Sequence, residues 1–381
     1  MSLVVPERTV SGRGSRRVIA ATLAACAGPV VIVRGRSAGW ADVLAADLRH
    51  TGRQVLEVTG QGEPSLPFLE GTLALLRPHA PGAVVAIGGG SVIDLGKALA
   101  ALLPAVLPPL EHLEVVGAGR PLDRAPLPFV AVPTTAGTGA EATKNAVIDV
   151  PAHRRKVSLR DVRMLPALAV LDADLTGGAP WPVTLMCGMD ALTQLIEPFL
   201  CARARPDVDR FCRVAIPLTM RALLRLSQGE DAEARDVLLA AAHLSGIALA
   251  NAGLGAVHGL AGVIGGQTHA PHGAICARLL PGVLRANAQA CGAAGMDTSR
   301  FAEVDRMIAG AFDAPGGSAA RLLKDWLAAA PLPPLDGDTG MNDLEVAELA
   351  AASSSMKANP VALASDVLAD IIAEGRSIGA R

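Results

Sequence analysis

Short apolar runs alternate with amphipathic stretches from the start of the chain to about residue 175. The runs PVVIVRG, VLEVTG, AVVAIGGG, PFVAVPTT and LAVLDADL are partly β-branched and are closed by Gly, Pro or Asp. Runs of this kind predict buried strands. Because helical stretches separate them, we predict a parallel, Rossmann-like sheet with helices on both faces.

The pattern changes after the segment TGGAPWP, Thr176–Pro182. Strand-like runs stop there, and Ala- and Leu-rich helical periodicity occupies the rest of the sequence. A chain of 381 residues is too long for one ordinary core and long enough for two domains. We therefore predict an α/β domain over residues 1–178 and an all-helical domain over residues 179–381.

Charge and cysteine content limit the class of binding partner and the cellular compartment that we expect. The formal net charge is −2 and the pI is near 6.5, so the chain lacks the cationic field that nucleic acid or an anionic membrane attracts. We expect a small-molecule partner, with no nucleic acid and no membrane. The N-terminal residues lack a signal-peptide pattern, and six cysteines are scattered without a CxxC pair. We expect a cytoplasmic protein with reduced thiols.

One long segment carries no charged residue, which raises the alternative of a membrane span. Val237–Ala277 has no Asp, Glu, Lys or Arg, and about 20 apolar residues suffice to cross a bilayer. Several histidines, Asn251, Gln267 and many glycines interrupt it. The segment therefore fits a buried helix pair in a soluble domain better.

A glycine cluster follows the third apolar run. Gly88, Gly89, Gly90 and Ser91 lie between a predicted strand and a predicted helix that contains Asp94. Glycines at such a turn let the backbone approach a phosphate, and the helix N-terminus supplies amide donors. GGGS also occurs as a plain turn, and it matches neither G-x-G-x-x-G nor the P-loop pattern. The cluster is thus either a pyrophosphate site or a simple turn.

A threonine-rich segment, VPTTAGTGAEATKNAVI, follows the next predicted strand. Hydroxyls and backbone amides at the carboxyl end of a strand suit nucleotide binding, so this loop and the glycine cluster are expected to face one crevice. The hydroxyls belong to Thr134, Thr135, Thr138 and Thr143. Lysines 97, 144 and 156 lie in or beside the two motifs, although any single one is more simply a surface lysine.

The segment GMDALTQLIEPF, Gly188–Phe199, predicts a helix with Asp190 and Gln194 on one face. A metal-binding helix carries its two ligands at this spacing. A neutral amide is nevertheless a poor ligand for zinc or ferrous iron. The residues alone leave the presence of a metal open.

Together these motifs resemble the iron-containing (group III) alcohol dehydrogenases, which are grouped with glycerol dehydrogenase and dehydroquinate synthase. The resemblance covers nearly the whole chain and is carried by ordered motifs: SGRGS, GGGSxxDxxK, PTTAGTGxExT, LDADLT, GMDALTQLIE and AVHGLAGVIGGQTHAPHGAICARLLPGVLRAN. It implies a nucleotide-binding α/β domain before an all-helical domain, with NAD(P) and a metal in the cleft between them, and a homodimer. It also implies hydride transfer between nicotinamide and a small carbonyl or alcohol.

The resemblance implies metal ligands at Asp190, His258 and His272, with Gln194 standing where the family usually has a first histidine. Three protein ligands and an open position suffice for catalytic zinc, so Fe²⁺ or Zn²⁺ is expected, with Gln194 binding a water or substrate oxygen. The alternative is a site that has lost its metal. In that case His258, His272 or His269 would donate a hydrogen bond or proton to the substrate oxygen.

Two further departures concern the proton relay and the cofactor. Gly262 stands where many members carry another histidine, and His269 is the candidate replacement. An Asp that binds the adenosine ribose in NAD-preferring members is replaced by Gly35. Because Arg34, Arg36 and Ser37 flank it and suit a phosphate monoester, we favour NADP(H) over NAD(H), with a cofactor-tolerant enzyme as the alternative.

By resemblance, one set of residues should bind the cofactor: Gly35, Arg36, Ser37, Gly88, Gly89, Gly90, Ser91, Asp94, Thr134, Thr135, Thr138, Thr143 and Lys156. The expected function is an NAD(P)-dependent alcohol dehydrogenase or aldehyde reductase. Two alternatives stay open. One is a maleylacetate-reductase-like enzyme acting on an acidic carbonyl substrate, and the other is a pseudoenzyme that binds nucleotide without turnover.

Overall fold

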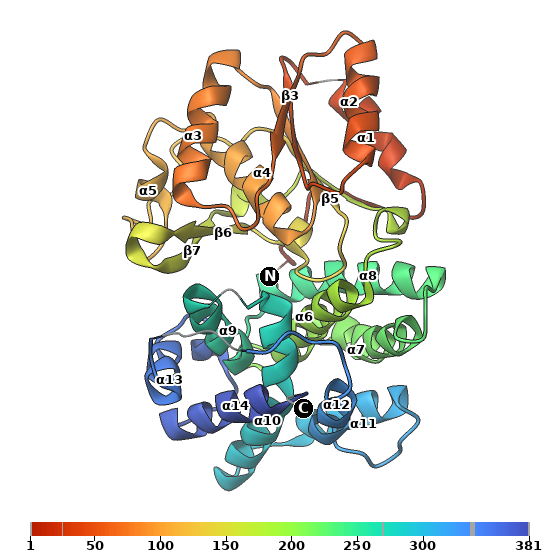
Figure 1. The fold of residues 1–381 in the computed structure, drawn as a ribbon. Coiled ribbons are helices and arrows are strands. Elements are labelled where there is room, and N and C mark those ends of the chain that lie inside the picture. Colours follow the sequence, from red (N-terminus) through yellow and green to blue (C-terminus); the bar gives the residue numbers. More distant parts are fainter. Residues whose placement is uncertain (1, 25, 269, 336–339, 380–381) are drawn as a thin grey trace. The chain divides into compact units, whose positions relative to one another are not determined.

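The computed structural model describes residues 2–24, 26–268, 270–335 and 340–379. The chain divides into two compact units, drawn in Figure 1. One unit is Val4–Gly177, and the other is Gly178–Arg381 together with Met1–Leu3. Each unit has its own core and is described by itself.

The first unit contains a six-stranded sheet in the order β1-β8-β5-β4-β2-β3. Every neighbouring pair in this sheet is parallel, which confirms the predicted fold class. The strands are β1 (Thr9–Ser11), β2 (Val30–Arg34), β3 (Val55–Thr59), β4 (Ala83–Gly88), β5 (Phe129–Pro133) and β8 (Leu168–Leu171).

Both faces of the sheet are covered, because alternate residues of each strand enter different cores. Val31 and Val33 of β2 belong to one apolar cluster, whereas Val30 and Ile32 belong to the other. The first cluster includes α3 (Leu66–Leu76), α4 (Gly90–Leu102) and α5 (Pro109–His112), and the second includes α1 (Val18–Leu23) and α2 (Trp40–His50). Figure 1 shows these two helix groups on opposite sides of the strands.

A two-stranded antiparallel ribbon, which the sequence analysis did not predict, packs against α4. It consists of β6 (Asn145–Val150) and β7 (Arg155–Arg160). Along β6, buried and partly buried residues alternate, which is the pattern of a strand with one covered face. Short 3₁₀ helices complete this unit: η1 (Ser15–Arg17), η2 (Arg77–His79), η3 (Ala140–Ala142), η4 (Pro151–His153), η5 (Val162–Met164) and η6 (Ala173–Leu175).

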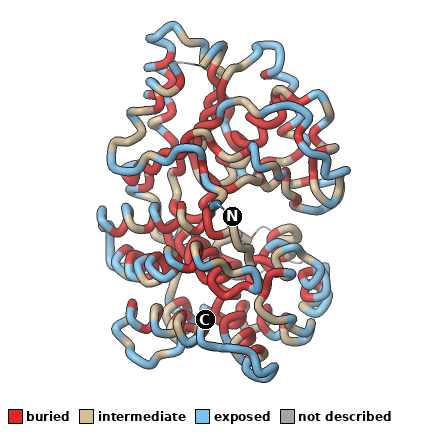
Figure 2. Tube along the Cα trace, turned by 180° about the vertical axis from the view of Figure 1, so that it is seen from behind, coloured by how far each residue is buried: buried red, intermediate tan, exposed pale blue. Residues whose placement is uncertain are grey.

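The second unit is built from helices in all its described parts. They are α6 (Trp181–Leu200), α7 (Pro206–Leu226), α8 (Ala232–Asn251), α9 (Ala256–Gln267), α10 (His272–Ala293), α11 (Ser299–Ala311), α12 (Ala319–Leu327), α13 (Asp343–Ala351), η7 (Met356–Ala358) and α14 (Ser365–Ser377). Helix α6 packs against α7, α8 and α10. All its residues from Gly188 to Leu200 are buried, and Figure 2 shows that exposed residues lie mainly on the outer helices.

Among the described residues, no single helix is long and apolar enough to cross a bilayer. Helices α8 and α9 pass that test of length and composition only as a pair, and they are bent by 98° at the break between them. The break contains Gly253, whose φ is 151°. A side chain at Gly255 would approach carboxylate and amide oxygens of Glu197 and Asn359 to 2.9 Å, so glycine is required there.

Candidate active site

Three loops of the α/β unit lie at one edge of the sheet, because the strands that precede them are parallel neighbours. In the register of β2, β4 and β5, Arg34 is opposite Ile87 and Gly88 is opposite Pro133. The residues after these strand ends are therefore next to one another. This edge is where ligands bind in open α/β sheets.

The glycine cluster and the threonine loop are in direct contact. A Cβ at Gly90 would lie 2.6 Å from the Thr138 hydroxyl oxygen, and one at Gly89 would lie 3.3 Å from the Thr135 hydroxyl oxygen. Only glycine leaves room for Thr138 at the start of α4. Since Thr138 is exposed and Thr135 is half-buried, both loops present polar groups at the expected edge.

Lys97 is buried, so its interpretation as a surface lysine is wrong. Its side chain is 1% exposed, and the ammonium donates to the Thr143 hydroxyl at 2.9 Å. It also reaches the carbonyl oxygens of Ala140 at 2.7 Å, Thr143 at 2.9 Å and Asn145 at 2.8 Å. Burial lowers the pKa of Lys97 to about 8, against the attraction of nearby carboxylates. The lysine thus fastens the threonine loop to α4.

Three predicted cofactor residues have partners inside the unit. Asp94 accepts a hydrogen bond from the Val147 amide at 3.0 Å, and burial raises its pKa to about 6. The Thr143 hydroxyl accepts from Lys97, and Lys156 forms an ion pair with Glu63. These contacts hold the ribbon and the loop in place, and cofactor binding by the three residues stays a prediction.

The residues predicted to select the cofactor follow β2. Arg36 and Ser37 are exposed, and Gly35 is half-buried. Arg34 is paired with Asp42, and the carboxylate of Glu57 lies 3.9 Å from its guanidinium. Its charge is therefore largely compensated within the unit, which leaves Arg36 and Ser37 as the candidate partners of a phosphate.

Side chains from three helices of the second unit meet at a candidate metal centre. Asp190 lies on α6, His258 on α9 and His272 at the start of α10. One Asp190 oxygen is 3.3 Å from His258 Nε2 and 3.7 Å from His272 Nε2. Asp190 and His258 are buried, whereas the His272 side chain is 40% exposed. The cluster is therefore accessible from the His272 side.

A fourth donor, Cys276, belongs to the same cluster. Its sulfur lies 3.6 Å from His272 Nε2 and 3.9 Å from His258 Nε2. The ligand atoms of Asp190, His258, His272 and Cys276 all lie within 4.8 Å of one another. Cys276 is not among the site residues predicted from the sequence, although its spacing of four residues from His272 on a helix is a detectable signal.

Glu197 orients one of the histidines. Its carboxylate lies 2.6 Å from His258 Nδ1 and accepts from the Val257 amide at 2.7 Å. A carboxylate only accepts hydrogen bonds, so Nδ1 carries a proton and Nε2 is the ring atom that faces Asp190 and Cys276. Glu197, the second carboxylate, is likewise not among the site residues predicted from the sequence.

Gln194 is buried beside Asp190, one turn along α6. Its side chain donates a hydrogen bond that helps to lower the pKa of Asp190. Its amide oxygen is buried without a hydrogen-bond partner among the described residues. Gln194 therefore supports the carboxylate and keeps one acceptor available, and its place in the metal site stays a prediction.

The cluster is strongly coupled electrostatically. Burial opposes the ionisation of Asp190, but the charges of His272 and His258 outweigh it, so the pKa of Asp190 lies below its ordinary value. The Cys276 thiolate raises the pKa of His272 to about 9, against the effect of burial. Burial would raise the pKa of Cys276, yet the two imidazoliums lower it. This donor set fits a divalent metal, which would replace the protons.

Two positions bear on the predicted proton relay. His269 lies outside the described residues. At Gly262, an added Cβ would meet no atom of the described residues within 4 Å, so this part of the structure shows open space there rather than a repacked core.

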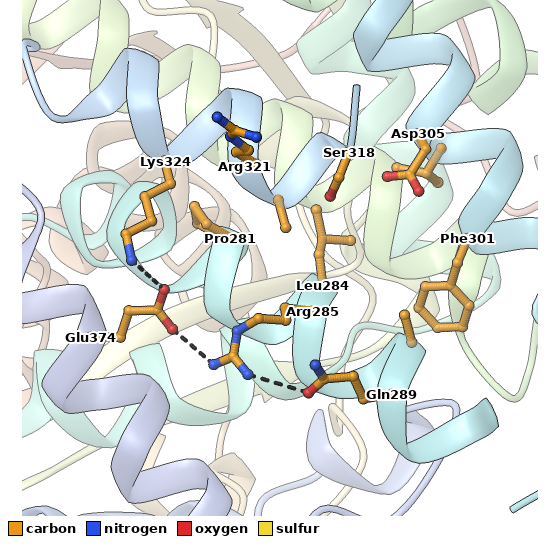
Figure 3. A pocket seen from close by; sticks show the side chains of 13 residues that line it. Pro281, Leu284, Arg285, Gln289, Phe301, Asp305, Ser318, Arg321, Lys324 and Glu374 are labelled. Carbon is orange, nitrogen blue, oxygen red and sulfur yellow. Dashed lines mark hydrogen bonds and ion pairs between the residues drawn. The ribbon is translucent and has the colours of Figure 1, made fainter. Parts of the chain in front are cut away.

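A cavity of about 360 Å³ in the helical unit is distinct from this cluster (Figure 3). Its lining comes from α10, α11, α12 and α14, and Glu374 binds both Lys324 and Arg285 at 2.8 Å. It contains no predicted site residue. Arg285 and Lys324 are both paired with Glu374, and the cavity gives no support to a catalytic role.

Known proteins share this architecture. An iron-containing alcohol dehydrogenase from Thermococcus thioreducens superposes with a TM-score of 0.85, at 26% identity, over 99% of each chain. Residues 6–173 match the family described as iron-containing alcohol dehydrogenase, and residues 184–374 match its Fe-containing C-terminal family. The chain therefore belongs to the iron-containing alcohol dehydrogenase family, which confirms the resemblance stated from the sequence motifs.

Curated relatives are matched over part of their length. A probable alcohol dehydrogenase EutG of Salmonella typhimurium is 39% identical over 65% of this chain and 60% of its own length. An NAD-dependent methanol dehydrogenase of Bacillus methanolicus is 30% identical over 80% of this chain and 79% of its own. Escherichia coli lactaldehyde reductase is 33% identical over 62% of this chain and 61% of its own.

Proposed function

We propose that the protein is an NAD(P)-dependent oxidoreductase that interconverts a small aldehyde or ketone and its alcohol. The observation that carries this proposal is the convergence of Asp190, His258 and His272 from three helices on one point. The family membership and the relatives named as alcohol dehydrogenases and a lactaldehyde reductase support it. The activity and the substrate class are proposals for this chain.

The glycine and threonine loops would bind the cofactor. Backbone amides of Gly88–Ser91 and the start of α4 suit the pyrophosphate, and Thr134, Thr135 and Thr138 would line the nicotinamide side. Arg36 and Ser37 favour NADPH, because both are exposed beside the same sheet edge. The cofactor supplies the hydride, and the chain orients it.

Asp190, His258 and His272 would hold Fe²⁺ or Zn²⁺. Such a metal supplies a Lewis acid that stabilises negative charge on the carbonyl oxygen. Glu197 keeps the proton of His258 on Nδ1. The free amide oxygen of Gln194 can accept a hydrogen bond from a water or a substrate hydroxyl, and His269 is the candidate proton relay.

The test is oxidation of NADPH and of NADH with a panel of short aldehydes and ketones. It is run on protein purified without chelators, before and after addition of Zn²⁺ or Fe²⁺. We expect turnover with neutral carbonyl substrates and a preference for NADPH that Arg36→Ala reduces about fivefold, as for an exposed charge pair of about 1 kcal/mol. Arg321→Ala, which removes a highly exposed arginine of the helical unit, is the matched control.

Other outcomes select other functions. Turnover restricted to carboxylated ketones would favour the maleylacetate-reductase-like enzyme. Nucleotide binding without turnover on any substrate, with metal present, would favour the nucleotide-binding pseudoenzyme and contradict the proposed activity.

A further inference from the structure

We propose that Cys276 is a fourth protein ligand, so that Asp190, His258, His272 and Cys276 form a mixed thiolate site that selects Zn²⁺ over Fe²⁺. This inference deepens the proposed function, because it defines the metal centre of the same site. It differs from the expectation of three protein ligands assisted by Gln194, and a substrate oxygen would add as a fifth ligand, an expansion that catalytic zinc sites permit.

The helix geometry brings Cys276 to the site. His272 and Cys276 are four residues apart on α10, so their side chains share one face. Cys276 is buried, and its sulfur has both imidazole Nε2 atoms within 3.9 Å. Because Glu197 occupies Nδ1 of His258, Nε2 of that ring is the atom left to face the thiol.

The distances between donors match the edges of a tetrahedral zinc site. With zinc bonds of about 2.0–2.1 Å to nitrogen or oxygen and about 2.3 Å to sulfur, a tetrahedron separates nitrogen from sulfur by about 3.6 Å and nitrogen from oxygen by about 3.3 Å. The sulfur-to-nitrogen distances here are 3.6 and 3.9 Å. The oxygen-to-nitrogen distances are 3.3 and 3.7 Å. Four of the six edges are therefore close to tetrahedral lengths, and all four donor atoms lie within 4.8 Å of one another.

The chemistry of the donors favours zinc. Thiolate is a soft ligand that suits Zn²⁺, and Zn²⁺ binds nitrogen, oxygen and sulfur donors more tightly than Fe²⁺ in general. One carboxylate, one thiolate and two neutral imidazoles carry two negative charges, which balance a divalent ion in a buried site. Cys276 therefore restores the ligand count that an amide at Gln194 lowers.

The first experiment replaces the metal with Co²⁺ and records the absorption spectrum. Thiolate bound to Co²⁺ gives a charge-transfer band in the near ultraviolet, whereas oxygen and nitrogen ligands do not. We expect the wild-type protein to show this band and Cys276→Ser to lose it while keeping bound cobalt. Cys291→Ser is the matched control, because Cys291 is a buried thiol on the same helix, away from the site.

The second experiment measures metal content and affinity. We expect purified wild-type protein to hold zinc in preference to iron when both are supplied. In competition with a chelator, the zinc affinity of Cys276→Ser should fall by at least about 10–100-fold. Losing a residue that only hydrogen-bonds to a metal ligand typically costs that much, and losing a ligand should cost no less. Cys291→Ser should retain wild-type affinity.

A measurement on the wild-type protein keeps the proposal testable if Cys276→Ser does not fold. X-ray absorption of the zinc-loaded protein should show one sulfur at about 2.3 Å from the metal. Bound zinc with only oxygen and nitrogen neighbours, or a cobalt spectrum without the charge-transfer band, would overturn the inference. So would a protein that binds neither metal, since the thiol and imidazoles would then form only an ion pair.

These readouts separate this inference from the proposed activity. Sulfur ligation in a protein without turnover would support the mixed thiolate site and contradict the proposed oxidoreductase activity. Turnover that depends on a metal with no sulfur neighbour would support the oxidoreductase activity and contradict the mixed thiolate site.

Discussion

Two buried polar centres, one in each unit, are built on opposite principles. In the α/β unit, the ammonium of Lys97 is surrounded by four oxygen acceptors of the chain. In the helical unit, Asp190, Cys276 and two imidazoles converge, and the protonated histidines supply the positive charge that lowers the pKa of Asp190 and of Cys276. The first centre is complete within the chain, whereas the second needs protons or a metal. A buried cation that the chain itself supplies therefore indicates structural support, whereas a cluster of buried donors without such a cation indicates a candidate metal or catalytic site.

Removing the cation of the first centre should have the largest effect. Lys97→Met leaves the carbonyl oxygens of the threonine loop and the Asp94 carboxylate without their buried partner, which costs about 3–5 kcal/mol in the free energy of unfolding. Chemical denaturation measures this. Lys324→Met, which removes a half-exposed ion pair with Glu374, should cost under about 1 kcal/mol. Equal losses in the two variants would contradict the structural role of Lys97.

Removing the carboxylate of the second centre should affect chemistry more than folding. Asp190→Asn keeps the size of the side chain but removes a charge from the donor set, so metal content should fall. kcat should drop by about 10²–10³-fold, as when one group that stabilises a transition state is lost. Steady-state kinetics and elemental analysis measure this. A variant with full metal content and normal kcat would show that Asp190 is not part of the site.

Loss of the orienting carboxylate should have a smaller effect than loss of a donor. Glu197→Gln can hydrogen-bond to His258 Nδ1 but no longer fixes which nitrogen carries the proton. Metal affinity should fall by about 10–100-fold, as measured by chelator competition. Because the variant tests tautomer control, the loss should be accompanied by a changed pH dependence of metal binding. An unchanged profile with lowered stability would indicate a purely structural role.

The pH dependence of the free energy of unfolding should sharpen the comparison further. The pKa of Lys97 falls from 10.5 to about 8 in the folded protein, so the unfolded state binds more protons between these values. The part of the free energy of unfolding that is linked to this proton is fully present above pH 10.5 and is lost as the pH falls through 8. Its slope is at most about 1.4 kcal/mol per pH unit. Denaturation between pH 7 and 10 measures the slope, on the order of 1 kcal/mol per unit. Lys97→Met should lack this component.

The same comparison explains how much of the fold the sequence could predict. The parallel sheet and the glycine and threonine loops could be predicted from local patterns, because strand runs and glycines are contiguous in the chain. The ribbon of β6 and β7 was missed, since β6 alternates buried and half-buried residues inside a segment interpreted as a loop. Its alternation is a weaker signal than a continuous apolar run.

The side chains that converge at the candidate metal centre could be predicted only in part, for a physical reason, and their role as ligands stays a prediction. Asp190, His258 and His272 were found from motifs, but Cys276 and Glu197 matter through packing between helices that are distant in sequence. Nothing in the local sequence shows that Glu197 reaches the ring of His258. Likewise, the burial of Lys97 depends on the path of the threonine loop, which local propensity does not determine.

The carboxylate of Glu197 fixes the position of the first residues of α9. One of its oxygens accepts from the Val257 amide and the other holds the ring of His258, while Asn359 accepts from the Ala256 amide. Each residue inserted into a helix rotates the remainder of that helix by about 100°. A residue inserted at the start of α9, before His258, would therefore turn the imidazole away from the Glu197 carboxylate, which makes this segment a poor place for insertions in engineering or in evolution.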